Sequence, residues 1–132
     1  YPDVDPTPAA TDAAGGPFAV DGVPGTDYAL PTFRRQDDGV LVLAVAGGTV
    51  APPPNDPVDT AFDRVRDGVA VGGTNSITLD LDGGDWRVVY TSLGRWTVPV
   101  EAGDAVQAGD VLGLVGASGD VFGPQLGVTI LY

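Results

Sequence analysis

Glycine and proline interrupt this chain too often for long helices. Its 132 residues include 20 Gly and 12 Pro, and both residue types weaken the interior of a helix. They suit short strands joined by tight turns, and the chain is long enough for one domain with its own core. The sequence therefore predicts an all-β domain, a small antiparallel sandwich or open barrel.

The first residues differ in composition from the rest. Residues 1–16, "YPDVDPTPAATDAAGG", offer almost nothing to bury. Such a segment remains extended unless a partner orders it. We therefore predict a flexible N-terminal arm or tether at residues 1–16 and the β domain at residues 17–132.

Three consecutive prolines open a segment that breaks the strand pattern. Prolines are excluded from helix interiors and central strands, so about residues 52–68 are predicted to be a Pro-rich insertion. Within it, Asp59 is a candidate cap for a short helix that carries Phe62 and Val65 inward and ends before Gly68.

Two alternating runs give the clearest local signal. "SITLDLDGGDWRVVY" places apolar residues at every second position on both sides of a Gly-Gly turn, which predicts a β-hairpin. The preceding run at residues 39–50, "GVLVLAVAGGTV", predicts a buried strand, a turn and a second short strand. The acidic residues of the hairpin favour turn chemistry and form only a weak calcium candidate: Asp80, Asp82 and Asp85.

The charge balance is strongly acidic. Eighteen acidic residues face six basic ones, for a net charge of −12, so the surface repels nucleic-acid phosphates and anionic lipids. We expect no nucleic-acid partner and no membrane span, because the longest apolar run is far too short for one. With no His and no Cys, the usual general base, thiol nucleophile and transition-metal ligands are missing.

Four short motifs follow one another between Gly22 and the C-terminus. The first, "VPGTDYALP", contains Val23, Gly25 and Asp27; the second is the strand "AVAGGTV". The third, "YTSL", closes the predicted hairpin. The fourth is a series of Gly-Asp turns that ends in "GPQLG", with Gln125 and Gly127.

In this order the motifs resemble those of the lysostaphin-type zinc endopeptidases, which cut peptide cross-bridges in bacterial cell walls. The resemblance implies their fold, an antiparallel sandwich of the duplicated hybrid motif kind. It also implies that the family's three zinc ligands fall at Val23, Asp27 and Gly127. The family's two proton-handling histidines fall at Gln125 and Ser92.

Of these five vestigial positions, only Asp27 keeps the family's residue. A catalytic zinc ion needs three protein ligands and an open position for water. Val23 and Gly127 offer no donor side chain, and neither Gln125 nor Ser92 is a competent base at neutral pH. We therefore predict a domain without zinc and without catalytic residues, which is not an enzyme.

Two functions then fit the chain. The first is a structural or scaffolding subunit of a cell-envelope or surface assembly, docked to protein partners partly through the N-terminal arm, outside the cytoplasmic membrane. The second is a non-cleaving module that binds peptidoglycan, peptide or carbohydrate, with Tyr90 and Trp96 as candidate groove residues. Tyr90 and Trp86 also fit the hairpin core.

Other interpretations are weaker. An unrelated β-barrel would show similar alternation, and a carboxylate pair could serve glycoside chemistry, although no pair is marked by its sequence surroundings. The Gly-Asp corner also resembles biotinyl and lipoyl carrier domains. Those attach their group through a lysine, and all six basic residues here are Arg, which excludes them.

Overall fold

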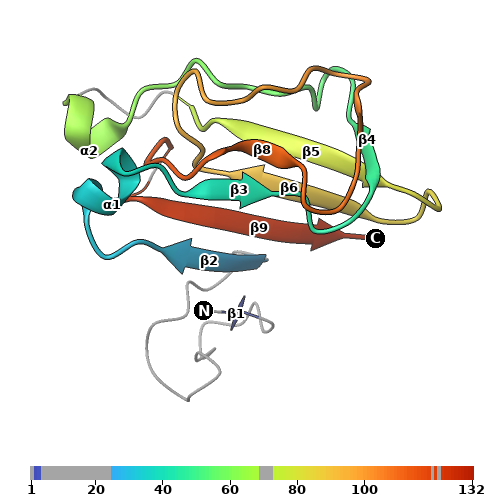
Figure 1. Cartoon of the computed structure of the whole chain (residues 1–132), viewed down its shortest axis with the longest axis horizontal. Helices are drawn as coiled ribbons and strands as arrows, with labels where there is room; N and C mark the ends of the chain where they lie inside the picture. Colours follow the sequence, from blue (N-terminus) through green and yellow to red (C-terminus); the bar gives the residue numbers. More distant parts are fainter. Residues whose placement is uncertain (1, 4–24, 69–72, 120, 122) are drawn as a thin grey trace.

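Two antiparallel sheets form the domain (Figure 1). The computed structural model describes residues 2–3, 25–68, 73–119, 121 and 123–132. The larger sheet has the strand order β1-β2-β9-β6-β5-β4-β7, and the smaller one pairs β3 with β8. The strands are β1 (Pro2–Asp3), β2 (Gly25–Ala29), β3 (Leu41–Leu43), β4 (Gly48–Val50), β5 (Ser76–Leu81), β6 (Arg87–Thr91), β7 (Ala105–Val106), β8 (Val111–Leu114) and β9 (Gln125–Leu131). Two short helices, α1 (Phe33–Asp37) and α2 (Arg64–Asp67), lie at one end of the sheets.

The predicted all-β antiparallel fold is confirmed. Of the predicted arm at residues 1–16, only Pro2–Asp3 is described, and it pairs with the edge of β2. The remainder of the arm lies outside the described residues. No helix in the described part of the chain is long and apolar enough to cross a bilayer.

The core lies between the β5–β6 hairpin and the small β3–β8 sheet. Ile77, Leu79 and Val88 face Val42 and Leu112 in one buried cluster. In Figure 1 the β3–β8 pair crosses one face of the larger sheet. The alternation read from the sequence therefore places one face of the hairpin in this core, and the predicted hairpin is confirmed.

The two aromatic residues of the hairpin differ in position. Tyr90 is 1% exposed, and its hydroxyl accepts a hydrogen bond of 3.0 Å from the Val45 N–H. Burial raises the pKa of the Tyr90 phenol, and the Val45 bond offsets part of that effect. Trp86 is 51% exposed and packs on Tyr132, so its assignment to the core was wrong.

Two Gly-Asp turns repeat the same bonds. Asp104 accepts from the Glu101 N–H at 2.9 Å, and Asp110 accepts from the Gln107 N–H at 2.8 Å. The glycine before each aspartate has a φ of 89°, a left-handed conformation that favours glycine. The sequence repeat is therefore a repeat of structure, and it turns the chain into β7 and β8.

Two local predictions need correction. The run at residues 39–50 forms the two predicted strands, β3, which pairs with β8, and β4, which pairs with β5 and β7, but β3 is not fully buried, because the side chains of Leu41 and Leu43 are exposed. The helix in the insertion has Asp63, not Asp59, at its N-cap position, and the Asp63 side chain makes no capping hydrogen bond. Phe62 and Val65 are 46% and 45% exposed instead of facing inward.

A buried amide joins the insertion to the sheet. The side chain of Asn75 accepts from the Ala61 N–H at 2.8 Å and donates to the carbonyl oxygens of Ala61 and Leu93. The Ser118 hydroxyl accepts from the Asn75 N–H and donates to the Leu93 carbonyl. Both side chains are fully buried, where an unmet polar group is costly.

We expect Asn75→Ala to lower the free energy of unfolding by about 2–3 kcal/mol, because it leaves Ala61 backbone groups unpaired. Ser118→Ala is expected to cost about 1–2 kcal/mol. Urea unfolding followed by circular dichroism measures both. Asn55→Ala, at an exposed position of the same loop, is the matched control and should stay within about 0.5 kcal/mol of the original protein. Equal losses at positions 55 and 75 would contradict this role.

Candidate functional site

The sheet register brings two of the vestigial positions face to face. Asp27 on β2 lies directly opposite Gly127 on β9, and Gly127 lies opposite Thr91 on β6. Residues that pair directly project from the same face of a sheet. Asp27, Gly127 and Thr91 therefore form one row across three adjacent strands.

This row lies on the face turned away from the core. Leu126 and Val128 alternate with Gly127 along β9 and pack against the core cluster. Successive side chains of a strand point to opposite faces. Gln125 shares the face of Gly127, so it projects on the same side as Asp27.

A backbone bridge brings Ser92 close to Gln125. The N–H of Gly116 donates to the Ser92 carbonyl at 3.0 Å, and the Gly116 carbonyl accepts from the Gln125 N–H at 2.9 Å. Ser92 is buried and has a φ of 63°, an uncommon conformation for a residue with a side chain. Backbone pairing and bonds thus connect the strand ends that carry Asp27, Gly127, Gln125 and Ser92, while Val23 lies outside the described residues.

Gly127 leaves little room for a side chain. A β-carbon built there would clash with Oγ1 of Thr91 and would lie 3.3 Å from Oδ1 of Asp27. The Thr91 hydroxyl thus occupies the space that a side chain at position 127 would need. Sequence reasoning missed Thr91, although it lies inside the quoted motif "YTSL".

The residues at the vestigial positions do not fit a zinc ion. Asp27 supplies one carboxylate, and neither Gly127 nor the valine at position 23 has a donor atom. Within the described ranges, no three His, Cys, Asp or Glu side chains converge to hold a metal ion. The side chains of Gln125 and Ser92 can offer hydrogen bonds.

The two aromatic candidates for a binding groove, Tyr90 and Trp96, differ in exposure. Tyr90 is core and does not line a groove, so that prediction was wrong. Trp96 is 64% exposed and has a φ of 60°, in the left-handed region that bulky residues rarely adopt. Its N–H donates to the Asp59 carbonyl at 2.8 Å.

Trp96 is flanked by a stack that the sequence did not suggest. The Arg95 guanidinium lies 3.8 Å from the centre of the Phe62 ring and 4.7 Å from that of Trp96. Its Nε donates to the Thr60 carbonyl at 3.0 Å. These cation–π contacts hold the insertion against the segment after β6.

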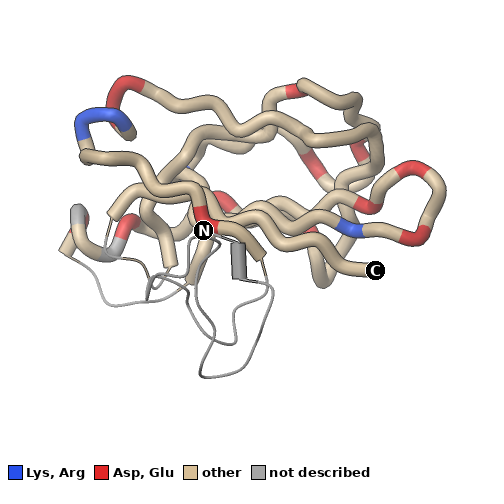
Figure 2. The backbone as a smooth tube through the Cα atoms, turned by 90° about the horizontal axis from the view of Figure 1, so that it is seen from below, with Lys and Arg blue, Asp and Glu red and all other residues tan. Residues whose placement is uncertain are grey.

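The weak calcium candidate is partly engaged elsewhere. Oδ1 of Asp80 accepts from Nε of Arg87 at 2.6 Å. Asp82 and Asp85 lie at the exposed end of the hairpin. Figure 2 shows the acidic positions spread over several loops, with few basic positions among them.

Comparison with known proteins identifies one family and several similar structures. Residues 24–132 match the family described as Peptidase family M23. The structure is similar to the catalytic domain of the antimicrobial peptidase lysostaphin from Staphylococcus simulans, with a TM-score of 0.60, 23% identity, and 87% of this chain and 72% of that chain covered. No curated protein matches the sequence.

Two further structures are similar over shorter parts of their length. A zinc-containing peptidase from Vibrio cholerae has a TM-score of 0.54 and 23% identity, covering 81% of this chain and 26% of that chain. A putative peptidase M23 from Pseudomonas aeruginosa has a TM-score of 0.53 and 26% identity, covering 79% and 36%. This chain therefore spans well under half the length of both.

We expect Gly127→Ala to lower the free energy of unfolding by about 1–3 kcal/mol, because its β-carbon overpacks the site. Thr91→Ala removes the clashing hydroxyl, so the cost of Gly127→Ala should fall by about 1 kcal/mol in that background. Thr91→Val is the matched control, since a methyl group replaces the hydroxyl and the full cost should persist. A double-mutant cycle by urea unfolding measures the coupling, and an identical cost in all three backgrounds would refute the assigned contact.

Proposed function

Because this chain belongs to peptidase family M23, we propose that it is a catalytically inactive member that serves as a structural or scaffolding subunit of a cell-envelope or surface assembly. The observation that carries the proposal is the glycine opposite Asp27. One carboxylate facing a residue without a side chain holds a zinc ion far too weakly for catalysis.

The other vestigial positions do not restore the chemistry. Gln125 carries a neutral amide, and Ser92 a neutral hydroxyl. Neither takes a proton from water at neutral pH, and the sequence contains no His to replace them. We therefore propose that the face of the sheet that carries Asp27 supplies no activated nucleophile, no general base and no catalytic metal site.

The surface supports a role in protein contacts. Leu41 and Leu43 project outward from β3, and Val111, the partner of Leu43 on β8, is exposed as well. Val45 extends the same aliphatic strip. Contiguous exposed apolar side chains of this kind mark contact surfaces, and a domain whose site has lost its chemistry acts through its surfaces.

The proposed partners and location follow from the same reasoning. The arm at residues 1–16 would add to the contact, because such segments order against a partner. The likeness of the domain to lysostaphin, an antimicrobial peptidase, favours a location outside the cytoplasmic membrane. Cell-wall polymer is a further partner to test.

Incubation with purified peptidoglycan and with pentaglycine, at saturating Zn²⁺, is expected to release no fragments detectable by mass spectrometry. Elemental analysis of the dialysed protein is expected to find far less than one zinc per chain. The lysostaphin catalytic domain serves as the active control. Release of fragments that stops on chelation would overturn the proposal.

A gain-of-function variant tests the assigned positions themselves. Val23→His and Gly127→His, combined with Thr91→Ala to make room at position 127, would restore the two imidazoles that the family resemblance assigns to the zinc ion alongside Asp27. We expect this variant to bind about one zinc ion per chain, and Asp27→Asn in the same background to weaken it by at least about tenfold. A correctly folded variant without zinc affinity would show that these positions do not form the ancestral site.

A second candidate function rests on Trp96. An exposed ring held in a rare backbone conformation suits stacking on a sugar or peptide. Under this alternative, the same peptidoglycan pellets would retain the intact protein and lose it on Trp96→Ala. Equal retention of both proteins would remove the aromatic argument.

For the scaffolding function, native mass spectrometry of the protein from its source is expected to find it in a complex of fixed stoichiometry. Leu43→Glu places a charge in the aliphatic strip and should release free monomer. Ala108→Glu adds the same charge at an exposed turn and should leave the complex intact. Free monomer alone, before any substitution, would contradict this function.

A further inference from the structure

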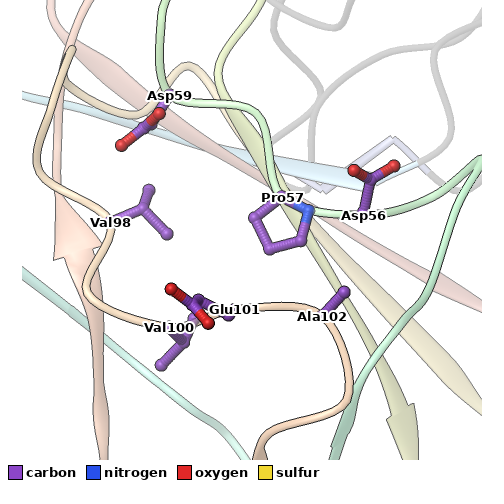
Figure 3. Close-up of a pocket in the computed structure, with 7 residues that line it drawn as sticks. All are labelled: Asp56, Pro57, Asp59, Val98, Val100, Glu101 and Ala102. Atoms are coloured by element: carbon purple, nitrogen blue, oxygen red, sulfur yellow. The ribbon is translucent and has the colours of Figure 1, made fainter.

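A hollow of about 340 Å³ lies beside the insertion, away from the described vestigial positions. It is an open hollow bordered by the loop that follows β4 and the segment that follows β6 (Figure 3). None of Asp27, Ser92, Gln125 and Gly127 lines it. Its walls are Asp56, Pro57, Asp59, Val98, Val100, Glu101 and Ala102.

The walls are fixed by backbone bonds before any ligand arrives. Val58 exchanges two hydrogen bonds with Ser76 on β5, and the Asp59 carbonyl accepts from the Trp96 N–H. On the other side, the Gly103 N–H donates to the Val50 carbonyl at 2.8 Å. A hollow held in this way loses little entropy on binding.

The hollow combines apolar walls with acidic side chains. Pro57, Val98, Val100 and Ala102 present aliphatic surface, and Figure 3 shows the carboxylates of Asp59 and Glu101 on either side of Val98. Between described residues, no hydrogen bond or ion pair involves the side-chain oxygens of Asp56, Asp59 or Glu101.

Arg95, the residue before Trp96, is engaged elsewhere. Arg95 lies over the rings of Phe62 and Trp96, and its Nε donates to the Thr60 carbonyl. It forms no ion pair within the described residues. Among the residues that line the hollow, three are acidic and none is basic, which favours a cationic ligand.

We infer that this hollow receives a lysine side chain of a protein partner. The inference rests on the proposed scaffolding function and names one contact of it. Four methylenes would pack on Val98, Val100 and Ala102 while the ammonium group reaches the carboxylates of Asp59 and Glu101. The volume lies at the lower end of the roughly 300–1,000 Å³ typical of ligand pockets, which suits a single side chain.

Other occupants fit the walls less well. A neutral sugar leaves the carboxylates without a counter-charge. A calcium ion demands six or more oxygen ligands, and the described residues contain no group of acidic side chains that converges on a metal. A guanidinium group prefers a planar, paired acceptor, whereas the two carboxylates here come from different segments.

The probe is the blocked peptide Gly-Gly-Lys-Gly-Gly, titrated into ¹⁵N-labelled protein at low ionic strength, where screening is weak. We expect saturable chemical-shift changes at the backbone amides of residues 56, 58–59, 98 and 100–102; Pro57 and Pro99 have no N–H. The same peptide with acetylated lysine should bind at least about fivefold more weakly, because it lacks the charge. Shifts centred elsewhere, or equal binding of the acetylated peptide, would overturn the inference.

Matched charge variants separate this hollow from the general acidity of the chain. Asp59→Asn with Glu101→Gln should weaken binding by about tenfold. Asp82→Asn with Asp85→Asn removes the same charge from the exposed end of the hairpin and should change the affinity less than about twofold. If both double variants weakened peptide binding equally, the peptide would be responding to the overall negative charge of the protein and not to this hollow.

Two further titrations identify the occupant. In the first, calcium chloride is titrated without peptide, and saturable shifts at the walls of the hollow would identify calcium as the occupant. In the second, the lysine of the peptide is replaced by arginine. Tighter binding of that peptide would identify arginine as the occupant, and either result would overturn the inference. The titration is independent of the wall-degradation assay and of the native complex. A hydrolytic domain that still binds the lysine peptide would refute only the proposed function, whereas an intact native complex without peptide binding would refute only the pocket.

Discussion

One buried amide, that of Asn75, holds together parts of the chain that hydrophobic burial alone leaves separate. Its two donors and its acceptor are all satisfied, by Ala61 in the insertion and by Leu93 after β6. The insertion contributes little to the core, because Phe62 and Val65 point outward. Its position therefore depends on polar bonds, and so do the stack of Arg95 and the hollow beside Asp59, which the insertion helps to build.

The register of the larger sheet, one face of which packs on the core, also determines which side chains lie together on its other face. Antiparallel register places Asp27 opposite Gly127 and Thr91 beside them. Burial specifies this register through Leu126 and Val128, and a slip by one residue would expose both. The scaffold of a metal site can thus persist under selection for packing alone, while the residues of the opposite face change.

Much of this arrangement was readable from the sequence, for physical reasons. Alternation specified the β5–β6 hairpin because the side chains of the core cluster alternate there with side chains outside that cluster. The ordered motifs gave the family and the places of Asp27 and Gly127. The partners of β3 and β4 were not readable, since they are set by contacts far along the chain. The role of Asn75 was hidden too, because a polar residue after glycines resembles a turn.

The surface positions of both tryptophans have a spectroscopic consequence. Trp86 packs on Tyr132 and Trp96 beside Arg95, so each indole already meets water in the native protein. Among the described residues, the one aromatic ring in the buried core cluster is the phenol of Tyr90, which emits weakly. Native emission would therefore resemble that of the denatured chain, and intrinsic fluorescence would report on ligand contacts at the two indoles far better than on global unfolding.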